Sequence, residues 1–147
     1  MMIIPHLILR KDSKILLTRR SQTNKIWASH WHCVTGSIEA GESPKEAIMR
    51  EAEEEIGIKL KDDVTLGTTV FLIEKDYFDS MKKFYALELF FVSDLGDDQE
   101  PINLEPSKQD SLGWFDPYKL PEPMIPGVAF GIKSYFSNQG YVEFRNV

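Results

Sequence analysis

Apolar stretches separated by polar turns predict strands on either side of two helices. Residues 2–20 hold two apolar segments around the polar run 11–14, which is the pattern of a β-hairpin. Two longer apolar stretches, 64–74 and 83–93, flank another exposed turn. We expect these two stretches to form a pair of long neighbouring strands.

Shorter elements complete the pattern. The segments expected to form short strands are 31–35, 112–115 and 141–144. Apolar residues recur at helical spacing in 125–136 and predict a helix, while the polar segments 21–28 and 94–108 predict loops. Strands before, between and after two helices predict one α/β domain, residues 1–147, built on a mixed sheet.

The first helix carries the clearest local signals. Ser43 is a good N-cap residue, Pro44 suits the first helical position, and Glu46 completes a capping box. Gly57 stands where a left-handed C-cap residue belongs. The sequence therefore predicts a helix over residues 44–56.

Composition narrows the function classes. Hydrophobic residues make up 42% and charged residues 27% of the chain, a balance typical of a folded domain rather than a disordered segment. The net charge of −6 offers no basic surface to duplex nucleic acid. The single cysteine, Cys33, excludes an internal disulfide and a zinc site built on cysteines. Since there is neither an apolar run of about 20 residues nor a signal-peptide pattern, we expect no membrane partner and a cytoplasmic location.

Acidic residues concentrate in the first predicted helix. Residues 42–55 contain six glutamates against Lys45 and Arg50, so this segment carries a net charge of −4. On a helical projection, the apolar face consists of Ile48, Met49, Ala52 and Ile56. The adjoining arc holds three glutamates at neighbouring positions: Glu51, Glu54 and Glu55. Glu46 and Glu53 fall on other arcs and are expected to face water.

Two interpretations of the acidic arc are open from these residues. One is a solvated helix face. The other is a site for a hard divalent cation, Mg²⁺ or Mn²⁺, which prefers oxygen ligands and completes its shell with water and substrate phosphates. The position of Arg50 among the acids, and the glycines on both sides of the segment, favour the cation site.

Residues 36–58 also show a family resemblance. Gly36, Glu42 and the run 50–58 match the pattern G-x5-E-x7-R-E-U-x-E-E-x-G-U, where U is aliphatic, without a gap. This pattern is the signature of the Nudix hydrolases, which the chain resembles. The resemblance implies an α/β/α sandwich with a mixed β-sheet. It also implies Mg²⁺-dependent hydrolysis, with Mn²⁺ able to substitute, of a nucleoside diphosphate linked to another moiety.

The resemblance also implies roles for individual residues. The implied metal ligands are the Thr35 carbonyl, Glu51, Glu54 and Glu55. The implied catalytic residues are Arg50, Glu51 and Glu54. Arg50 would form an ion pair that orients the glutamates, and Glu42 would support either the loop or the metal cluster. The proton of the attacking water would go either to Glu54 or to a loop glutamate, Glu100.

Substrate contacts are implied outside the acidic helix. Arg20 ends the second strand in a Thr-Arg-Arg sequence similar to that of MutT-type members, whose second arginine reaches the nucleotide. Gly36 and Glu100 are further expected substrate contacts. Trp27 and Trp31 precede the motif and could stack on a base, although Trp31 is better suited to the core. Neither of the neighbouring histidines, His30 and His32, is assigned a catalytic role.

Two further likenesses concern the substrate. Residues 31–42 are similar to bacterial dihydroneopterin triphosphate pyrophosphatases. Residues 103–126, which include the run Asn103-x-Glu105-Pro106-x-Lys108, resemble MutT-type nucleoside triphosphate pyrophosphatases. Met124 stands near the place where MutT-type enzymes use an asparagine to read oxidised guanine, so the likeness does not extend to that specificity.

We therefore predict an enzyme, a Mg²⁺-dependent pyrophosphohydrolase that converts a nucleoside triphosphate-like substrate into a monophosphate and pyrophosphate. One alternative is dihydroneopterin triphosphate pyrophosphatase-like activity. Another is a non-catalytic nucleotide-binding module, which the complete set of motif glutamates disfavours. An isopentenyl diphosphate isomerase of the same fold would need further cysteine and metal-binding features. The expected partner is a small nucleotide or nucleotide-like diphosphate, bound by a monomer or homodimer.

Overall fold

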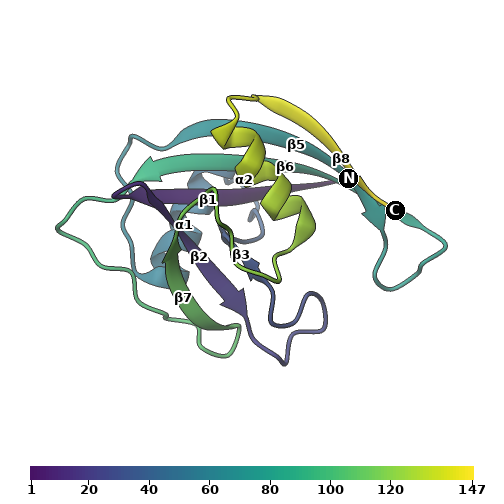
Figure 1. The fold of residues 1–147 in the computed structure, drawn as a ribbon, viewed down its shortest axis with the longest axis horizontal. Helices are drawn as coiled ribbons and strands as arrows, with labels where there is room; N and C mark the ends of the chain where they lie inside the picture. The colour runs from purple at the N-terminus through teal and green to yellow at the C-terminus, as the bar shows by residue number, and fades with distance from the viewer.

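The computed structural model describes residues 1–147, and its centre is a mixed sheet of eight strands with one helix on each face (Figure 1). The strands are β1 (Met2–Lys11), β2 (Lys14–Arg20), β3 (Trp31–His32), β4 (Val34–Thr35), β5 (Thr65–Lys75), β6 (Lys83–Asp94), β7 (Gln109–Phe115) and β8 (Tyr141–Asn146). Their order is β3-β2-β1-β6-β5-β8, while β4 pairs with β1 and β7 pairs with β2. The β1–β6 and β5–β8 pairs are parallel, and the others are antiparallel.

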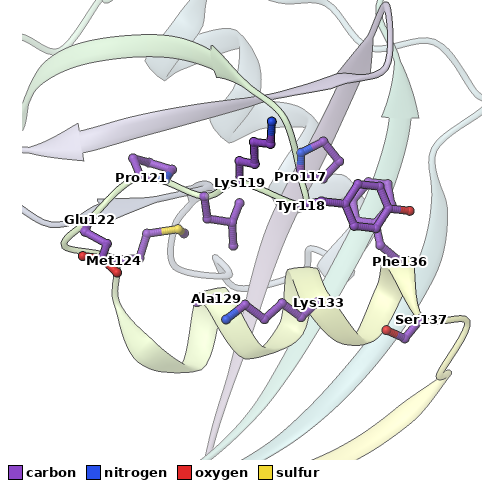
Figure 2. Close-up of a pocket in the computed structure, with 11 residues that line it drawn as sticks. Pro117, Tyr118, Lys119, Pro121, Glu122, Met124, Ala129, Lys133, Phe136 and Ser137 are labelled. Carbon is purple, nitrogen blue, oxygen red and sulfur yellow. The ribbon is translucent and has the colours of Figure 1, made fainter.

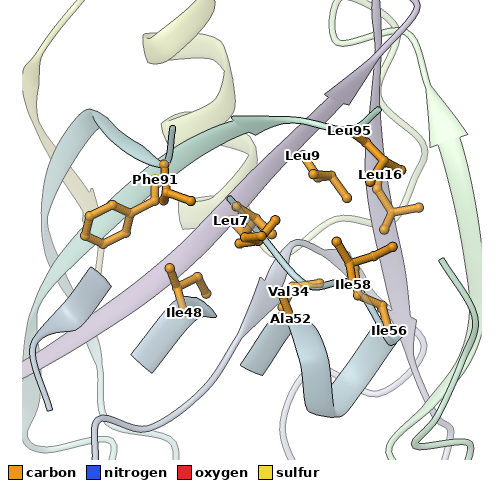
Figure 3. Close-up of a cluster of buried hydrophobic side chains, with 12 residues drawn as sticks. Leu7, Leu9, Leu16, Val34, Ile48, Ala52, Ile56, Ile58, Phe91 and Leu95 are labelled. Atoms are coloured by element: carbon orange, nitrogen blue, oxygen red, sulfur yellow. The ribbon is translucent and has the colours of Figure 1, made fainter. Parts of the chain in front are cut away.

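The two helices, α1 (Pro44–Ile56) and α2 (Pro126–Phe136), cover opposite faces of the sheet. One apolar cluster lies under α1 (Figure 3) and a second lies under α2. Strand β1 contributes to both, because successive side chains of a strand point to opposite faces. Leu7 and Leu9 pack toward α1, and Ile8 packs toward α2. The α/β/α sandwich with a mixed sheet is thus confirmed.

Helix α1 has the predicted bounds and caps. The Ser43 hydroxyl accepts a hydrogen bond from the Glu46 backbone N–H, and the Glu46 carboxylate accepts one from the Ser43 N–H. Gly57 ends the helix in the left-handed conformation, with φ of 68°. The predicted β1–β2 hairpin is also present, with Asp12 and Ser13 at positive φ in its turn. The two long strands are β5 and β6.

The segment 31–35 differs from the single strand that was predicted. Its first two residues pair with β2 and its last two pair with β1, with Cys33 buried between them. The chain therefore changes its partner strand within a few residues, which a pattern of apolar residues does not encode. Strand β7 begins earlier than predicted, because its pairing with β2 extends to Gln109 opposite Arg20. No helix has the length and apolar character required to cross a membrane.

Candidate active site

Arg50 connects the acidic residues of α1 with the loop that precedes the helix. Its Nε and Nη2 atoms donate to the two Glu42 carboxylate oxygens at 2.8 and 3.0 Å. Its Nη1 atom donates to Glu51 at 2.8 Å and to Glu54 at 3.1 Å, and Nη2 also donates to the Ser37 carbonyl at 2.9 Å. The hydrogen bonds from Arg50 hold the pKa of Glu42 below its ordinary value. One guanidinium therefore sets the direction of several carboxylates.

The loop after β4 packs against the Glu51 side chain, and this contact requires glycine. A Cβ atom at Gly36 would overlap the Glu51 carboxylate group. The preceding residue, Thr35, is held opposite His6 of β1, and its hydroxyl donates to the Pro5 carbonyl at 2.6 Å. Burial raises the pKa of Glu51, although Arg50 opposes the shift. The loop and helix thus form one wall of a shared site.

Glu55 carries a carboxylate oxygen that lacks a partner. Its Oε2 atom is buried and accepts no hydrogen bond. Burial, followed by the negative charges of Glu51 and Glu105, raises the pKa of Glu55 to about 8. A backbone contact from Thr35 and the positive charge of Lys108 act in the opposite direction. A cation at this carboxylate would relieve both the missing contact and the repulsion.

The loop before β7 is fastened to the C-terminal end of α1. The backbone N–H groups of Ile102 and Leu104 donate to carbonyls in the last turn of the helix at 3.0 Å each. The Asn103 side chain donates to the Gln109 carbonyl at 2.7 Å and accepts from the Glu105 N–H at 3.1 Å. These bonds bring Glu105 to the acidic side of α1.

Glu105 is the site residue that the sequence reasoning missed. Its charge raises the pKa of both Glu51 and Glu55, and its carboxylate lies 3.2 Å from the ammonium group of Lys108. Glu100, the loop glutamate that the sequence suggested, is exposed, and its charge does not act on Glu51 or Glu55 as that of Glu105 does. The signal that could have identified Glu105 was the Asn-x-Glu-Pro-x-Lys run, which was noted only as a family likeness.

The structure gathers most of the predicted residues around one polar cavity of about 420 Å³. None of its lining residues is hydrophobic, and they include Arg20, Thr35, Gly36, Glu51, Glu55 and Lys108. Glu54 does not line the cavity. Its side chain is 52% exposed, and its one side-chain partner is Arg50. The three glutamates of the predicted arc are therefore divided between the cavity and its outer edge.

The residues of the cavity fit a hard divalent cation. As the side chains stand, no three metal-ligating residues form a group that could hold an ion, since Arg50 binds both Glu51 and Glu54. The Oε2 atom of Glu55 is nevertheless a buried carboxylate oxygen without a partner. Together with Glu51 and the Thr35 carbonyl it supplies oxygen ligands of the kind that Mg²⁺ and Mn²⁺ prefer.

A second, largely apolar cavity of about 390 Å³ adjoins the polar one on the α2 side of the sheet. Arg20, His32 and Thr35 line both cavities. Burial lowers the pKa of His32 to about 3, so its ring is neutral at this junction. Trp27 lines the apolar cavity, whereas Trp31 packs against the core under α2.

A separate cavity of about 590 Å³ lies between residues 117–124 and α2 (Figure 2). Lys119 extends from the loop, and Lys133 extends from the helix. None of the residues of the acidic motif lines this cavity. We therefore place the candidate active site in the polar cavity beside α1.

The chain is similar to known proteins along nearly its whole length. The NUDIX domain family model matches residues 3–135. The uncharacterized Nudix hydrolase YvcI of Bacillus subtilis is 27% identical over 142 residues, which cover 95% of this chain and 82% of YvcI. An isopentenyl-diphosphate Delta-isomerase of Salmonella heidelberg is 36% identical over 56 residues, but these cover only 37% of this chain and 31% of the isomerase.

Solved structures show the same fold. A MutT NUDIX hydrolase from Burkholderia pseudomallei superposes with a TM-score of 0.73 at 26% identity, covering 90% of this chain and 95% of that protein. The E. coli dihydroneopterin triphosphate pyrophosphohydrolase superposes with a TM-score of 0.68 at 19% identity, covering 92% and 95%. Because the family model spans nearly the whole sandwich, the chain belongs to the Nudix family of hydrolases.

Proposed function

We propose that this Nudix hydrolase is a Mg²⁺-dependent pyrophosphohydrolase that cleaves a nucleoside triphosphate-like substrate to a monophosphate and pyrophosphate. The observation that carries the proposal is the junction of two cavities at Arg20 and Thr35. The polar cavity suits a polyphosphate with its cation, and the apolar cavity suits a ring system. A substrate with both parts would place its phosphate chain beside Glu51 and Glu55.

The side chains around the polar cavity have separable tasks in this proposal. Arg50 positions Glu51 and Glu54 through the hydrogen bonds from its Nη1 atom. Arg20 and Lys108 attract phosphate oxygens. A divalent cation, held by Glu51, Glu55 and the Thr35 carbonyl, would neutralise phosphate charge and lower the pKa of water when bound. Mn²⁺ is expected to substitute for Mg²⁺.

Glu54 is the proposed general base. Its exposed carboxylate lies outside the cluster of buried acids, and its remaining oxygen is free to receive the proton of the attacking water. Glu105, in place of Glu100, is the loop carboxylate proposed to support the cation site, because its charge acts on both Glu51 and Glu55.

Two other substrates and one other reaction are the alternatives to this proposal. One structural neighbour is named a dihydroneopterin triphosphate pyrophosphohydrolase, so that triphosphate belongs among the substrates to be tested. Another neighbour is a NUDIX domain complexed with ADP ribose, so ADP-ribose also belongs there. An isomerase activity has less support, because the single thiol, Cys33, is completely buried and burial raises its pKa.

A substrate panel tests the proposal. Purified protein is incubated with ribo- and deoxyribonucleoside triphosphates, dihydroneopterin triphosphate or ADP-ribose, in EDTA, Mg²⁺ or Mn²⁺. We expect a monophosphate and pyrophosphate from one class of triphosphate, only with a divalent cation. Release of orthophosphate and a diphosphate would contradict the proposed bond. Binding without turnover of any compound would instead identify a nucleotide-binding module.

A further inference from the structure

Glu88 occupies a position in the sheet that would ordinarily be apolar. It lies on the central strand β6, opposite Ile4 of β1 and Val70 of β5, and its residue surface is only 5% exposed. Burying a carboxylate without compensation costs free energy, so a buried carboxylate in a sheet centre normally has bonded partners.

The Glu88 carboxylate has no such set of partners. Its Oε2 atom is buried and accepts no hydrogen bond. Its Oε1 atom lies 3.4 Å from Nε2 of His6, yet neither ring nitrogen of His6 makes a hydrogen bond. The His6 ring instead stacks on Phe90, with 4.5 Å between ring centroids. The Oε2 atom of Glu88 is therefore a hydrogen-bond acceptor for which the protein supplies no donor.

The Glu88 side chain lies between the apolar cavity and the start of α2. Glu88 lines that cavity, and its Oε2 atom would lie 3.4 Å from a Cβ atom at Gly127, in the first turn of the helix. The positive end of the helix dipole favours a negative charge at this place. No side chain caps the N-terminus of α2, and the Glu88 carboxylate lies beside its first turn.

The walls of the cavity are suited to a flat ring. Trp27, Tyr77 and Phe84 line it. Trp27 and Tyr77 meet edge to face, with 5.5 Å between centroids, and the Tyr77 hydroxyl donates to Glu74 at 2.8 Å. Glu74 thereby uses one of its oxygens within the protein, whereas the Oε2 atom of Glu88 has no partner.

We propose that Glu88 is a specificity-determining residue that selects a flat heterocycle with two adjacent N–H donors, a ring N–H beside an exocyclic amino group. A carboxylate accepts two parallel N–H bonds from such an edge. The 2-amino-4-oxopyrimidine edge carries these donors and occurs in both guanine and pterin rings. The inference rests on the proposed function, because Arg20 and Thr35 connect this ring site to the phosphate site.

Phosphate-free ligands test the ring site without any need for hydrolysis or metal. Isothermal titration calorimetry in EDTA compares guanosine with inosine, which lacks only the exocyclic amino group. We expect the wild-type protein to bind guanosine about tenfold more tightly than inosine, because inosine lacks the amino group that would donate to the Glu88 carboxylate. A third titration uses 6-hydroxymethylpterin and distinguishes a guanine ring from a pterin ring. Whichever of guanosine and 6-hydroxymethylpterin binds more tightly identifies the preferred ring.

Glu88→Gln and Glu53→Gln form the matched pair of variants. Glu53 is an exposed residue of α1 that lines neither cavity. We expect Glu88→Gln to bring the guanosine-to-inosine affinity ratio within about twofold, while its affinity for inosine shows that the cavity is intact. Glu53→Gln should keep the wild-type ratio.

Three outcomes would overturn the inference: equal affinities in the wild type, an unchanged ratio in Glu88→Gln, or no binding of any ring ligand at millimolar concentration. A guanosine or pterin preference that depends on Glu88 in a protein that hydrolyses nothing would leave the inference standing and reject the proposed function. Hydrolysis of a substrate without any preference among the ring ligands would leave the proposed function standing and reject the inference about Glu88.

Discussion

Glu55 and Glu88 are both buried carboxylates with an unpartnered Oε2 atom, yet they face cavities of opposite character. Glu55 lies among other acids, which raise its pKa, so the group that completes its surroundings is a cation. Glu88 lines a mostly apolar cavity at a helix N-terminus, where Glu74 already accepts a bond from Tyr77, and the group proposed to complete its surroundings is an N–H donor. The same functional group therefore selects charge in one cavity and a hydrogen-bond pattern in the other.

The largest expected effect is a loss of kcat that separates Glu54, the proposed general base, from Glu53, which is exposed to water. Replacing Glu54 by Gln should lower kcat by roughly 10² or more, the scale of a lost general base, with the fold intact. Glu53→Gln removes the same charge from the same helix and should change kcat by no more than a few-fold. Steady-state kinetics on the best substrate of the panel provide the measurement. Equal losses in the two variants would mean that net charge, and not position on the helix, controls the rate.

The pH dependence of stability should distinguish Glu55 from an ordinary acid. In the metal-free protein the pKa of Glu55 is about 8, above its ordinary value of 4.5, so the folded state prefers the protonated form. Its contribution to stability is complete below pH 4.5 and is lost as the pH rises toward 8. Glu55→Gln should therefore be more stable than the wild type at pH 8 in EDTA, by roughly 1–3 kcal/mol.

Urea unfolding of both proteins at pH 5 and pH 8 in EDTA measures this difference. At pH 5 the two free energies of unfolding should lie much closer together, because the wild-type carboxyl is then largely protonated. Parallel curves for the two proteins at both pH values would contradict the description of Glu55 as a carboxylate that lacks a cation.

Disturbing the contact between Gly36 and Glu51 should change the polar cavity and leave the apolar cavity unchanged. In Gly36→Ala the new methyl group must displace the Glu51 carboxylate, the flexible end of a side chain. We expect kcat/KM to fall roughly tenfold, because a misplaced ligand weakens the catalytic geometry. Guanosine affinity should not change. Gly140→Ala is the control, since nothing lies within 4 Å of its Cβ position. A loss of ring binding in Gly36→Ala would show that the cavities are not independent.

Addition of a cation should give the smallest effect. Millimolar Mg²⁺ or Mn²⁺ should raise the Tm of the wild type above its value in EDTA by about 2–6 °C, because the ion relieves repulsion among Glu51, Glu55 and Glu105. Glu55→Gln should show a smaller increase, and Glu88→Gln should show the full one. Thermal scans without any difference between EDTA and Mn²⁺ would contradict a cation site formed before substrate binds.

The sequence alone determined the elements whose stabilising contacts are local. The caps of α1 join Ser43 to Glu46 and end at Gly57, so their signals lie within one helix length. The Arg50 contacts with Glu42, Glu51 and Glu54 likewise span at most eight positions. The motif in residues 36–58 could therefore identify the family and five of the eleven residues that line the polar cavity, because these residues and their scaffold are contiguous.

Only the tertiary structure decided which distant residues lie near Glu55 and which surround Glu88. Glu105 reaches Glu55 because backbone hydrogen bonds fasten its loop to the end of α1, whereas Glu100, five positions earlier, stays exposed. Glu88 lies in a run of apolar residues whose pattern predicts only a buried strand. Its neighbours His6 and Gly127 come from the two ends of the chain. Burial and the lack of a partner arise from the packing of separate elements, and no local pattern encodes them.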